Sequence, residues 1–400
     1  MKIWMVILLG CGLVLQAASH YEETPVEMVM MDDFGQEVQN HPSPMPGVEV
    51  NVTEEVISAD EYLQEDEAFS QEAVQSVQLE MKKPKIALLV PRKVIGGYAN
   101  SVANAILSYL LYTKQHFVME VFDSGTQKEE DLMIALEKIK HKGYQLVIAP
   151  LTAEGANTLA PMVKNMLVYV PTVNIDDMRV DNPNFLYGGI DYKVQVDALL
   201  QYANEKIVVF GDGSALAKKI SDYVHESRYE DIVYSKEIKN VRANLSYLFK
   251  RNSKLKNASI FLNMPVVKSA LVASQLSRYK VPYNKLLSTQ VNYSPLLFTL
   301  TQKQDRERFY IANAIGKAPF ALQDINDLIG GDIRFNWINY ASSVGVDYLF
   351  TDLLGFRGSR VFSEELFSQQ VYYDTEIVKP KDGSFQHVNS VVAAPGGDQL

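Results

Sequence analysis

From residue 85 onward, the chain alternates between short apolar runs and longer segments in which apolar residues recur every three or four positions. The apolar runs have the length of β-strands, and the segments between them have the period of amphipathic helices. Strands that read as unbroken apolar runs, each followed by a helix, are typical of a parallel sheet covered on both faces. The pattern therefore predicts an α/β fold.

The alternation falls into two sets of about four units each, and the second set begins near residue 206. In the first set we predict strands at 85–90, 117–125, 144–150 and 166–174, with helices at 96–113, 128–142 and 154–164. In the second set we predict strands at 206–212, 231–238, 258–265 and 284–291, with helices at 215–226, 241–251 and 266–279. Two similar sets fit two lobes better than one oversized sheet.

Loops at the carboxyl ends of parallel strands form the crevice where α/β proteins bind ligands. The loops predicted there carry hydroxyl and amide side chains, which suit a small neutral, zwitterionic or anionic ligand beside helix N-termini. Alternatively, the cleft is vestigial and these residues are ordinary helix caps and turn formers. The candidate ligand-binding residues are Tyr98, Ser101, Thr152, Thr172, Asn174, Tyr187, Ser214, Asn292 and Tyr293.

Reactive patterns are missing from these loops. None of the six histidines lies in them, and the chain has no zinc, nucleophile-elbow or phosphate-loop motif. The stretch "GDGSA" at 211–215 lacks the third glycine of a dinucleotide fingerprint. Asp176, Asp177 and Asp191 read as solvated loop carboxylates, because an oxygen-ligand metal site needs several carboxylates at fixed offsets. We expect no enzyme activity, cofactor, metal or nucleic-acid partner, since basic stripes with interleaved aromatics are also missing.

Charge is concentrated in one segment. Residues 21–80 contain 16 Asp or Glu and no Lys or Arg. The whole chain carries −10, of which this segment contributes −16 and Lys2 contributes +1, which leaves +5 for residues 81–400. So acidic a segment without an apolar period cannot bury enough surface to offset its ordering entropy. We read 20–83 as a disordered tether, and 391–400 as a flexible tail.

The first 19 residues read as a signal peptide, with Lys2, an apolar run and small residues near Ala18. Cys11 lies in "LLGC", which resembles a lipoprotein box, so a lipid anchor or a retained anchor are the alternatives to cleavage. Each alternative places the body outside the cytoplasmic membrane, and a bacterial periplasm is the expected location. Asn51, in "EVNVTE", resembles the acidic sequon of bacterial N-glycosylation.

The order of units resembles type 1 periplasmic binding proteins of the branched-chain amino-acid receptor kind, over about residues 84–390. The landmarks are "KIALLVPRKVIGGYANSVANAI", "YQLVIAPLTAEGANTLAPMV", "VYVPTVNID", "NFLYGGIDYKVQVDALLQYA", "KIVVFGDGSALAKKISDYV" and "NKLLSTQVNYSP", with "FNWINYASSVGVDYLFTDLL" as the late helix. The resemblance implies three crossings between the lobes. It assigns about 84–200 and 296–350 to lobe one, and about 201–295 with part of 351–390 to lobe two.

The resemblance also implies residue roles. Thr152 and Ala153 match the groups that bind a ligand carboxylate in the amino-acid receptors, while Asp191 and Asp212 are candidates for its ammonium group. The first loop departs from the family, because "PRKVIGG" is bulkier and more basic than the usual Ser-Gly-Pro run. The body is also similar to the C-terminal domain of the lipoproteins that activate penicillin-binding proteins, which act through protein contacts.

These observations favour a non-enzymatic, exported bacterial protein that binds a small polar ligand, such as an amino acid, for transport or sensing. The alternative is an envelope interaction protein with a vestigial cleft, such as a penicillin-binding-protein activator or an accessory of the flagellar motor. In that case, the partner is another envelope protein.

Overall fold

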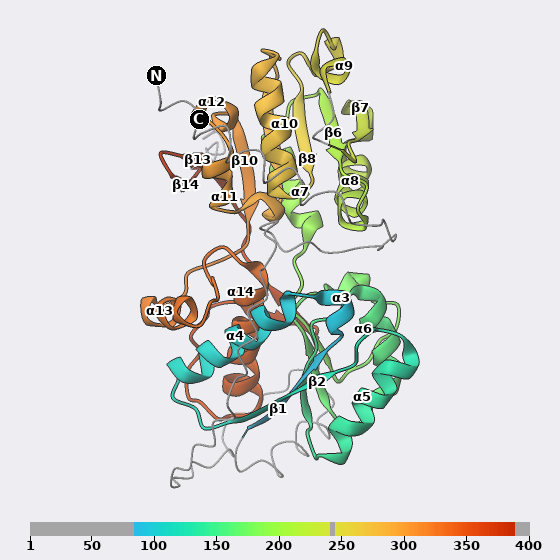
Figure 1. Cartoon of the computed structure of the whole chain (residues 1–400), viewed down its shortest axis with the longest axis vertical. Helices are drawn as coiled ribbons and strands as arrows, with labels where there is room; N and C mark the ends of the chain where they lie inside the picture. The colour runs from blue at the N-terminus through green and yellow to red at the C-terminus, as the bar shows by residue number, and fades with distance from the viewer. Residues whose placement is uncertain (1–83, 241–244, 389–400) are drawn as a thin grey trace, which may run out of the picture.

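The computed structural model describes residues 84–240 and 245–388, which form two α/β lobes stacked along the long axis of the molecule (Figure 1). Each lobe is built on a seven-stranded sheet of mainly parallel strands. The predicted α/β architecture with two lobes is therefore confirmed. The expected signal peptide, acidic tether and flexible tail, with Cys11 and Asn51, lie outside the described residues.

The first sheet has the strand order β11-β12-β5-β4-β3-β1-β2. Its strands are β1 (Lys85–Val90), β2 (Val118–Asp123), β3 (Leu146–Ile148), β4 (Leu167–Val170), β5 (Phe185–Tyr187), β11 (Glu365–Phe367) and β12 (Gln370–Tyr372). The helices of this lobe are α3 (Arg92–Ile95), α4 (Tyr98–Tyr112), α5 (Glu129–His141), α6 (Ala153–Leu159), α13 (Phe320–Leu328) and α14 (Trp337–Tyr348).

The second sheet has the strand order β14-β13-β10-β9-β8-β6-β7. Its strands are β6 (Ile207–Gly211), β7 (Ile232–Glu237), β8 (Ser259–Asn263), β9 (Lys285–Ser288), β10 (Phe309–Asn313), β13 (Glu376–Lys381) and β14 (Ser384–His387). Its helices are α7 (Tyr192–Leu200), α8 (Ala215–Arg228), α9 (Ser246–Phe249), α10 (Val266–Arg278), α11 (Leu296–Leu300) and α12 (Lys303–Arg306).

Both faces of each sheet are buried, as the unbroken apolar runs predict. In β1, Ile86 and Leu88 face a core shared with α4 and α14, whereas Ala87 and Leu89 face a core shared with α5 and α6. The same alternation in β6 divides its residues between a core with α10 and a core with α7 and α8. Burial on both faces fixes the register of these strands, because a slip of one residue would exchange the two sets.

The division between the lobes differs from the expected one in two places. Helix α7 belongs to lobe two, because its buried residues Val196 and Leu199 pack in one core with Ile207. Residues 296–313 also belong to lobe two, since β10 pairs with β9 in parallel and with β13 in antiparallel orientation. The three crossings therefore follow β5, β10 and β12.

The predicted strands and helices agree with the observed ones, with most ends shifted by a few residues. The predicted helix at 241–251 is represented by α9, and its first residues lie outside the described part. Strands β5 and β10 to β14 were not predicted, because they are short or have mixed polarity. Within the described ranges, every helix is too short or too polar to cross a membrane.

Candidate functional site

The position expected to bind a ligand carboxylate is occupied by a side chain of the protein. Thr152 is the N-cap of α6, and its hydroxyl accepts a hydrogen bond from the Gly155 N–H at 3.2 Å. The Thr152 hydroxyl also donates to Gln127 Oε1 at 2.6 Å, and the Thr152 N–H donates to the same oxygen at 3.3 Å. The Gln127 carboxamide therefore satisfies the donors that a ligand carboxylate would use next to Ala153, the first residue of α6.

Gly155 makes room for this arrangement. A Cβ at Gly155 would lie 1.7 Å from Gln127 Oε1, so the amide lies directly against the glycine in the first turn of α6. Sequence reasoning missed Gln127, because the loop that follows β2 was not counted among the cleft loops. Its position after a parallel strand was the available signal.

The acidic residue at the carboxyl end of β6 also has an internal partner. The carboxylate of Asp212 accepts a hydrogen bond from Lys268 Nζ of α10 at 2.7 Å, and the Asp212 side chain is only 5% exposed. The Ser214 N–H donates to the other carboxylate oxygen at 3.1 Å. Lys268 thus pairs with one of the two acidic residues that were candidates for a ligand ammonium group.

Three further candidates make hydrogen bonds that cap or tie their own loops. Ser214 caps α8 by accepting from the Ala217 N–H at 3.2 Å. Asn174 caps a short 3-10 turn (Ile175–Asp177) by accepting from the Asp176 N–H at 3.0 Å. The Thr172 hydroxyl donates to the Leu151 carbonyl, which links the loops after β3 and β4. These contacts agree with the alternative in which the loop residues act as helix caps and turn formers.

The other candidates lie mostly in or beside the cores. Tyr187 was expected in the cleft, but it is 2% exposed and its ring lies 6.1 Å from that of Phe185. Asn292 is fully buried and donates to Ser288 Oγ at 2.6 Å. Tyr98 is 8% exposed at the start of α4, and Ser101 is half-buried one turn later. Several of the ligand-binding candidates at strand ends are therefore buried in the protein interior instead of lining a cleft.

Tyr293 lies between the lobes and packs against the cores of both. Its ring centroid is 4.6 Å from that of Phe385 in β14 and 5.4 Å from that of Phe335, which precedes α14 in lobe one. Burial raises the pKa of Tyr293 to about 12, with smaller contributions from nearby acidic residues. Tyr293 therefore stays neutral and acts as part of an aromatic contact between the lobes.

A second interlobe contact is ionic. Lys219 Nζ of α8 donates to Asp177 Oδ2 at 2.6 Å, and both side chains are about a quarter exposed. Asp177 lies after β4 in lobe one, so this pair bridges the lobes at the carboxyl ends of the two sheets. Among the described residues, no group of three or more His, Cys, Asp or Glu side chains is arranged to hold a metal ion.

The Asp212–Lys268 pair predicts a pH dependence of stability. Burial by itself would raise the pKa of Asp212, but hydrogen bonds from Lys268 and Ser214 hold it below its usual value. The stabilisation is therefore present above the unfolded-state pKa of about 3.9 and is lost as the pH falls through the lower folded-state value. We expect Lys268→Gln to lower the free energy of unfolding at pH 7 by about 2 kcal/mol.

Urea unfolding at pH 7 and pH 3 measures this effect. The difference between Lys268→Gln and the wild type should shrink at the lower pH, where Asp212 approaches its protonated form. The exposed Lys218→Gln on α8 serves as a matched control and should leave stability nearly unchanged at both values. An equal loss at both pH values for Lys268→Gln would contradict the assignment.

Comparison with known proteins identifies the fold through solved structures of low sequence identity. No family model matches the sequence, and no curated protein matches it. An extracellular ligand binding receptor from Desulfohalobium retbaense is 11% identical and has a TM-score of 0.55; the match covers 77% of this chain and 60% of that one. LivJ from Streptococcus pneumoniae, a branched-chain amino acid transporter substrate binding protein solved with isoleucine, is 10% identical with a TM-score of 0.55.

Coverage differs among these structures. The LivJ match covers 77% of this chain and 99% of LivJ. Haemophilus influenzae LpoA is 11% identical with a TM-score of 0.52, and the match covers 77% of this chain but 59% of LpoA. The chain thus spans about three fifths of the first receptor and of LpoA. At these identities the likeness concerns the fold alone. Taken with the two sheets and three crossings, the matches establish that the chain has the two-lobed fold of the type 1 periplasmic binding proteins.

Proposed function

We propose that this protein is a non-catalytic, exported bacterial envelope protein that acts through contacts with another envelope protein, with an interlobe cleft filled by its own side chains. The main evidence is that the Thr152 hydroxyl and N–H both donate hydrogen bonds to the Gln127 side chain. A solute receptor keeps these donors free for its ligand. In this chain they are satisfied without one.

The pairing of Asp212 with Lys268 supports the same proposal. An amino-acid ligand has a carboxylate and an ammonium group. In the amino-acid receptors, hydrogen-bond donors bind the carboxylate and an acidic residue binds the ammonium group. Here Gln127 Oε1 replaces the first group and Lys268 Nζ replaces the second. Displacing Lys268 would leave a nearly buried carboxylate without its charged partner, which is costly. The cleft is therefore better suited to holding its present conformation than to exchanging solutes.

Contacts between the lobes also favour a fixed arrangement. The Lys219–Asp177 pair and the contact of Tyr293 with Phe335 join the lobes without a ligand. Large apolar side chains are exposed elsewhere: Phe320 and Leu328 of α13 are 84% and 85% exposed. We take α13, which presents both side chains to solvent, as the candidate contact with the partner protein.

A solute screen tests the proposal. We expect free amino acids, short peptides and cell-wall fragments to leave the melting temperature of the full chain unchanged. A ligand present at about 100 times its dissociation constant adds about 2.7 kcal/mol of stability, which is readily measured as a shift. A reproducible shift with one solute, abolished by Thr152→Val, would contradict the proposal and identify a receptor.

The second candidate function is solute binding, and one observation favours it. Gln127 Nε2 is buried without a hydrogen-bond partner among the described residues, which is costly and would be relieved if the side chain moved out. The variant Gln127→Ala separates the two functions. If it gains amino-acid binding that the wild type lacks, the cleft is a blocked receptor site. If a receptor were already functional, the wild type would bind at least as well as the variant.

A further inference from the structure

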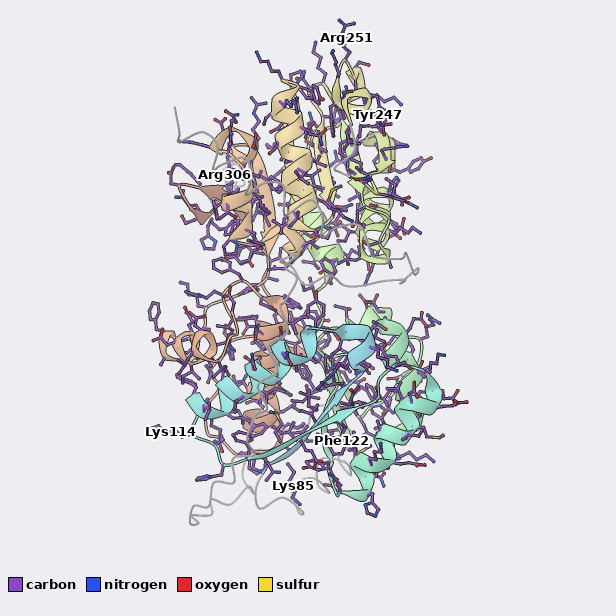
Figure 2. The ribbon with its side chains drawn as sticks, in the orientation of Figure 1. Lys85, Lys114, Phe122, Tyr247, Arg251 and Arg306 are labelled. Atoms are coloured by element: carbon purple, nitrogen blue, oxygen red, sulfur yellow. The ribbon has the colours of Figure 1, made fainter. Side chains whose placement is uncertain are left out.

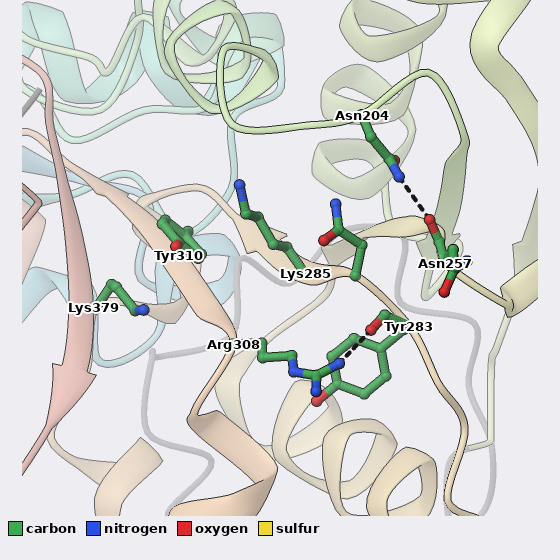
Figure 3. A pocket seen from close by; sticks show the side chains of 8 residues that line it. Asn204, Asn257, Tyr283, Lys285, Arg308, Tyr310 and Lys379 are labelled. Carbon is green, nitrogen blue, oxygen red and sulfur yellow. Dashed lines mark hydrogen bonds between the residues drawn. The ribbon is translucent and has the colours of Figure 1, made fainter. Parts of the chain in front are cut away.

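Lobe two has a cavity at the amino ends of its strands, at the opposite end of the sheet from the interlobe cleft. Its volume is about 510 Å³, within the range of small-molecule sites. It is lined by Asn204, Asn257, Tyr283, Asn284, Lys285, Arg308, Tyr310 and Lys379 (Figure 3). The lining residues come from the loops before β6, β8, β9 and β10 and from strands β9, β10 and β13, so the sheet holds them in fixed positions.

Three of the residues that line the cavity are cations. Lys285, Arg308 and Lys379 are among its lining residues, none of the lining residues is acidic, and none of the three cations forms an ion pair within residues 84–240 and 245–388. Gathering like charges in one cavity costs free energy, and a bound anion would recover it. Two cations near the other end of the lobe-two strands or at a helix end, Lys268 and Arg228, do have carboxylate partners.

Tyr310 organises two of these cations. Lys379 Nζ lies 4.7 Å from the Tyr310 ring centroid and Lys285 Nζ lies 5.1 Å from it. Figure 3 shows the ring between the two lysines. The ring quadrupole attracts both ammonium groups, which eases their mutual repulsion and keeps them on the cavity wall.

A structural role for the cations accounts for only part of this arrangement. Lys285 Nζ donates to the Tyr202 carbonyl at 2.8 Å, just beyond the end of α7, and Arg308 donates to the Tyr283 carbonyl at 2.6 Å. These bonds orient the side chains, but carbonyl oxygens do not neutralise the charge. An ammonium has three donors and a guanidinium has five, so most donors remain for a ligand. The Lys379 ammonium lies over the Tyr310 ring and makes no hydrogen bond or ion pair within the described chain.

We propose that this cavity binds a phosphorylated saccharide. Arg308 offers a planar fork that matches phosphate oxygens, and the two lysines supply further positive charge in the same cavity. The carboxamides of Asn257 and Asn284, which also line the cavity, suit the hydroxyl groups of a sugar. The carrier of the phosphate is either a free sugar phosphate or a membrane-linked one, since both present the same groups.

The acidic segment of the chain is a less suitable occupant. Residues 21–80 precede the described chain, whose first strand begins at Lys85 at the foot of lobe one (Figure 2). The cavity lies in lobe two, at the amino ends of its strands, and so at the end of that lobe that faces away from lobe one. To occupy the cavity, this segment would have to run the length of both lobes, whereas a diffusing ligand enters from solvent.

Isothermal titration of the full chain with glucose 1,6-bisphosphate tests the proposal, with glucose as the neutral comparison. We expect binding of the bisphosphate, no binding of glucose, and an affinity that falls as salt is raised. Lys379→Gln and Arg308→Gln should each weaken binding about tenfold, because each removes a charge-assisted contact. Lys236→Gln, an exposed lysine of β7 outside the cavity, should leave the affinity unchanged.

A vesicle arm distinguishes the two sources of phosphate. Phosphatidylcholine vesicles with and without phosphatidylinositol 4-phosphate are sedimented with the protein. Binding of the phosphoinositide vesicles that Lys379→Gln weakens would indicate a membrane-linked ligand; soluble binding alone would indicate a free one. Absence of binding in both arms, or equal binding by wild type, Lys379→Gln and Arg308→Gln, would overturn the proposal. Unchanged melting temperatures of the variants would show that they fold.

Discussion

Replacing Asp347 by alanine is expected to lower the free energy of unfolding by about 3–5 kcal/mol, the typical cost of removing one partner from a buried charged network. Asp347 lies in α14 and is fully buried. Its carboxylate accepts hydrogen bonds from the Tyr109 hydroxyl at 2.8 Å and from the backbone N–H groups of Val361 and Phe362 at 2.8 and 2.9 Å. Without it, these buried donors lose their acceptor.

Two arginines extend the same network. Arg357 and Arg360 approach the Asp347 carboxylate at 3.6 and 3.7 Å, and both side chains are largely buried. In the alanine variant, both guanidinium groups lose a buried counter-charge. The carboxylate thus fixes the loop that leads from α14 to β11, which returns the chain to the first sheet.

Urea denaturation monitored by circular dichroism measures the loss. Asp324→Ala, an exposed position of α13 in the same lobe, is the matched control and should stay within about 0.5 kcal/mol of the wild type. Tyr109→Phe removes one hydrogen bond and keeps the ring, so it should cost about 1 kcal/mol. A cost for Asp347→Ala no larger than that of Tyr109→Phe would refute the role of the network.

The central strands could be predicted because burial leaves a simple trace in the sequence. Strands such as β1 and β8 are apolar apart from Lys85, Ser259 and Asn263 at their ends, since helices cover both faces of the sheet. The edge strands leave a weaker trace. In β11 and β14, only Leu366 and Phe385 are not exposed, and the interior strand β10 is a short run that could equally have joined either lobe. Their pairing depends on contacts between distant residues, which no local pattern encodes.

The candidate site was predictable only as a set of loops. Sequence order placed Thr152 and Asp212 at the carboxyl ends of strands, where the structure has them. It could not identify their partners, because Gln127 and Lys268 are 25 and 56 residues away along the chain. Whether a polar group is free for a ligand depends on which distant side chain reaches it. A receptor and a scaffold can therefore share the same loop residues and differ in function.

Gly345→Ala is expected to lower the free energy of unfolding by about 3 kcal/mol, at the upper end of the cost of overpacking. Alanine favours a helix over glycine by about 1 kcal/mol, so a loss requires a steric cause. A Cβ at Gly345 in α14 would lie 2.0 Å from Cζ of Tyr169. The Tyr169 ring is fully buried, and its hydroxyl donates to the Ala341 carbonyl at 2.6 Å.

The ring has little room to retreat, because Gly188 meets it from another side. A Cβ there would lie 2.0 Å from the Tyr169 hydroxyl. Overpacking at Gly345 must therefore separate α14 from the first sheet. Gly358→Ala is the matched control, since a Cβ at that position meets no atom within 4 Å. It should leave the urea midpoint nearly unchanged.

A double-mutant cycle separates the clash from a general weakness of the helix. Tyr169→Leu alone should be destabilising, because it leaves a cavity in the core of lobe one. Combined with Gly345→Ala, the total loss should be smaller than the sum of the two single losses, since the smaller side chain removes the clash. Additive losses would mean that the ring and the glycine do not interact. A coupling of more than about 1 kcal/mol would instead establish that a glycine in α14 sets how closely this helix approaches β4.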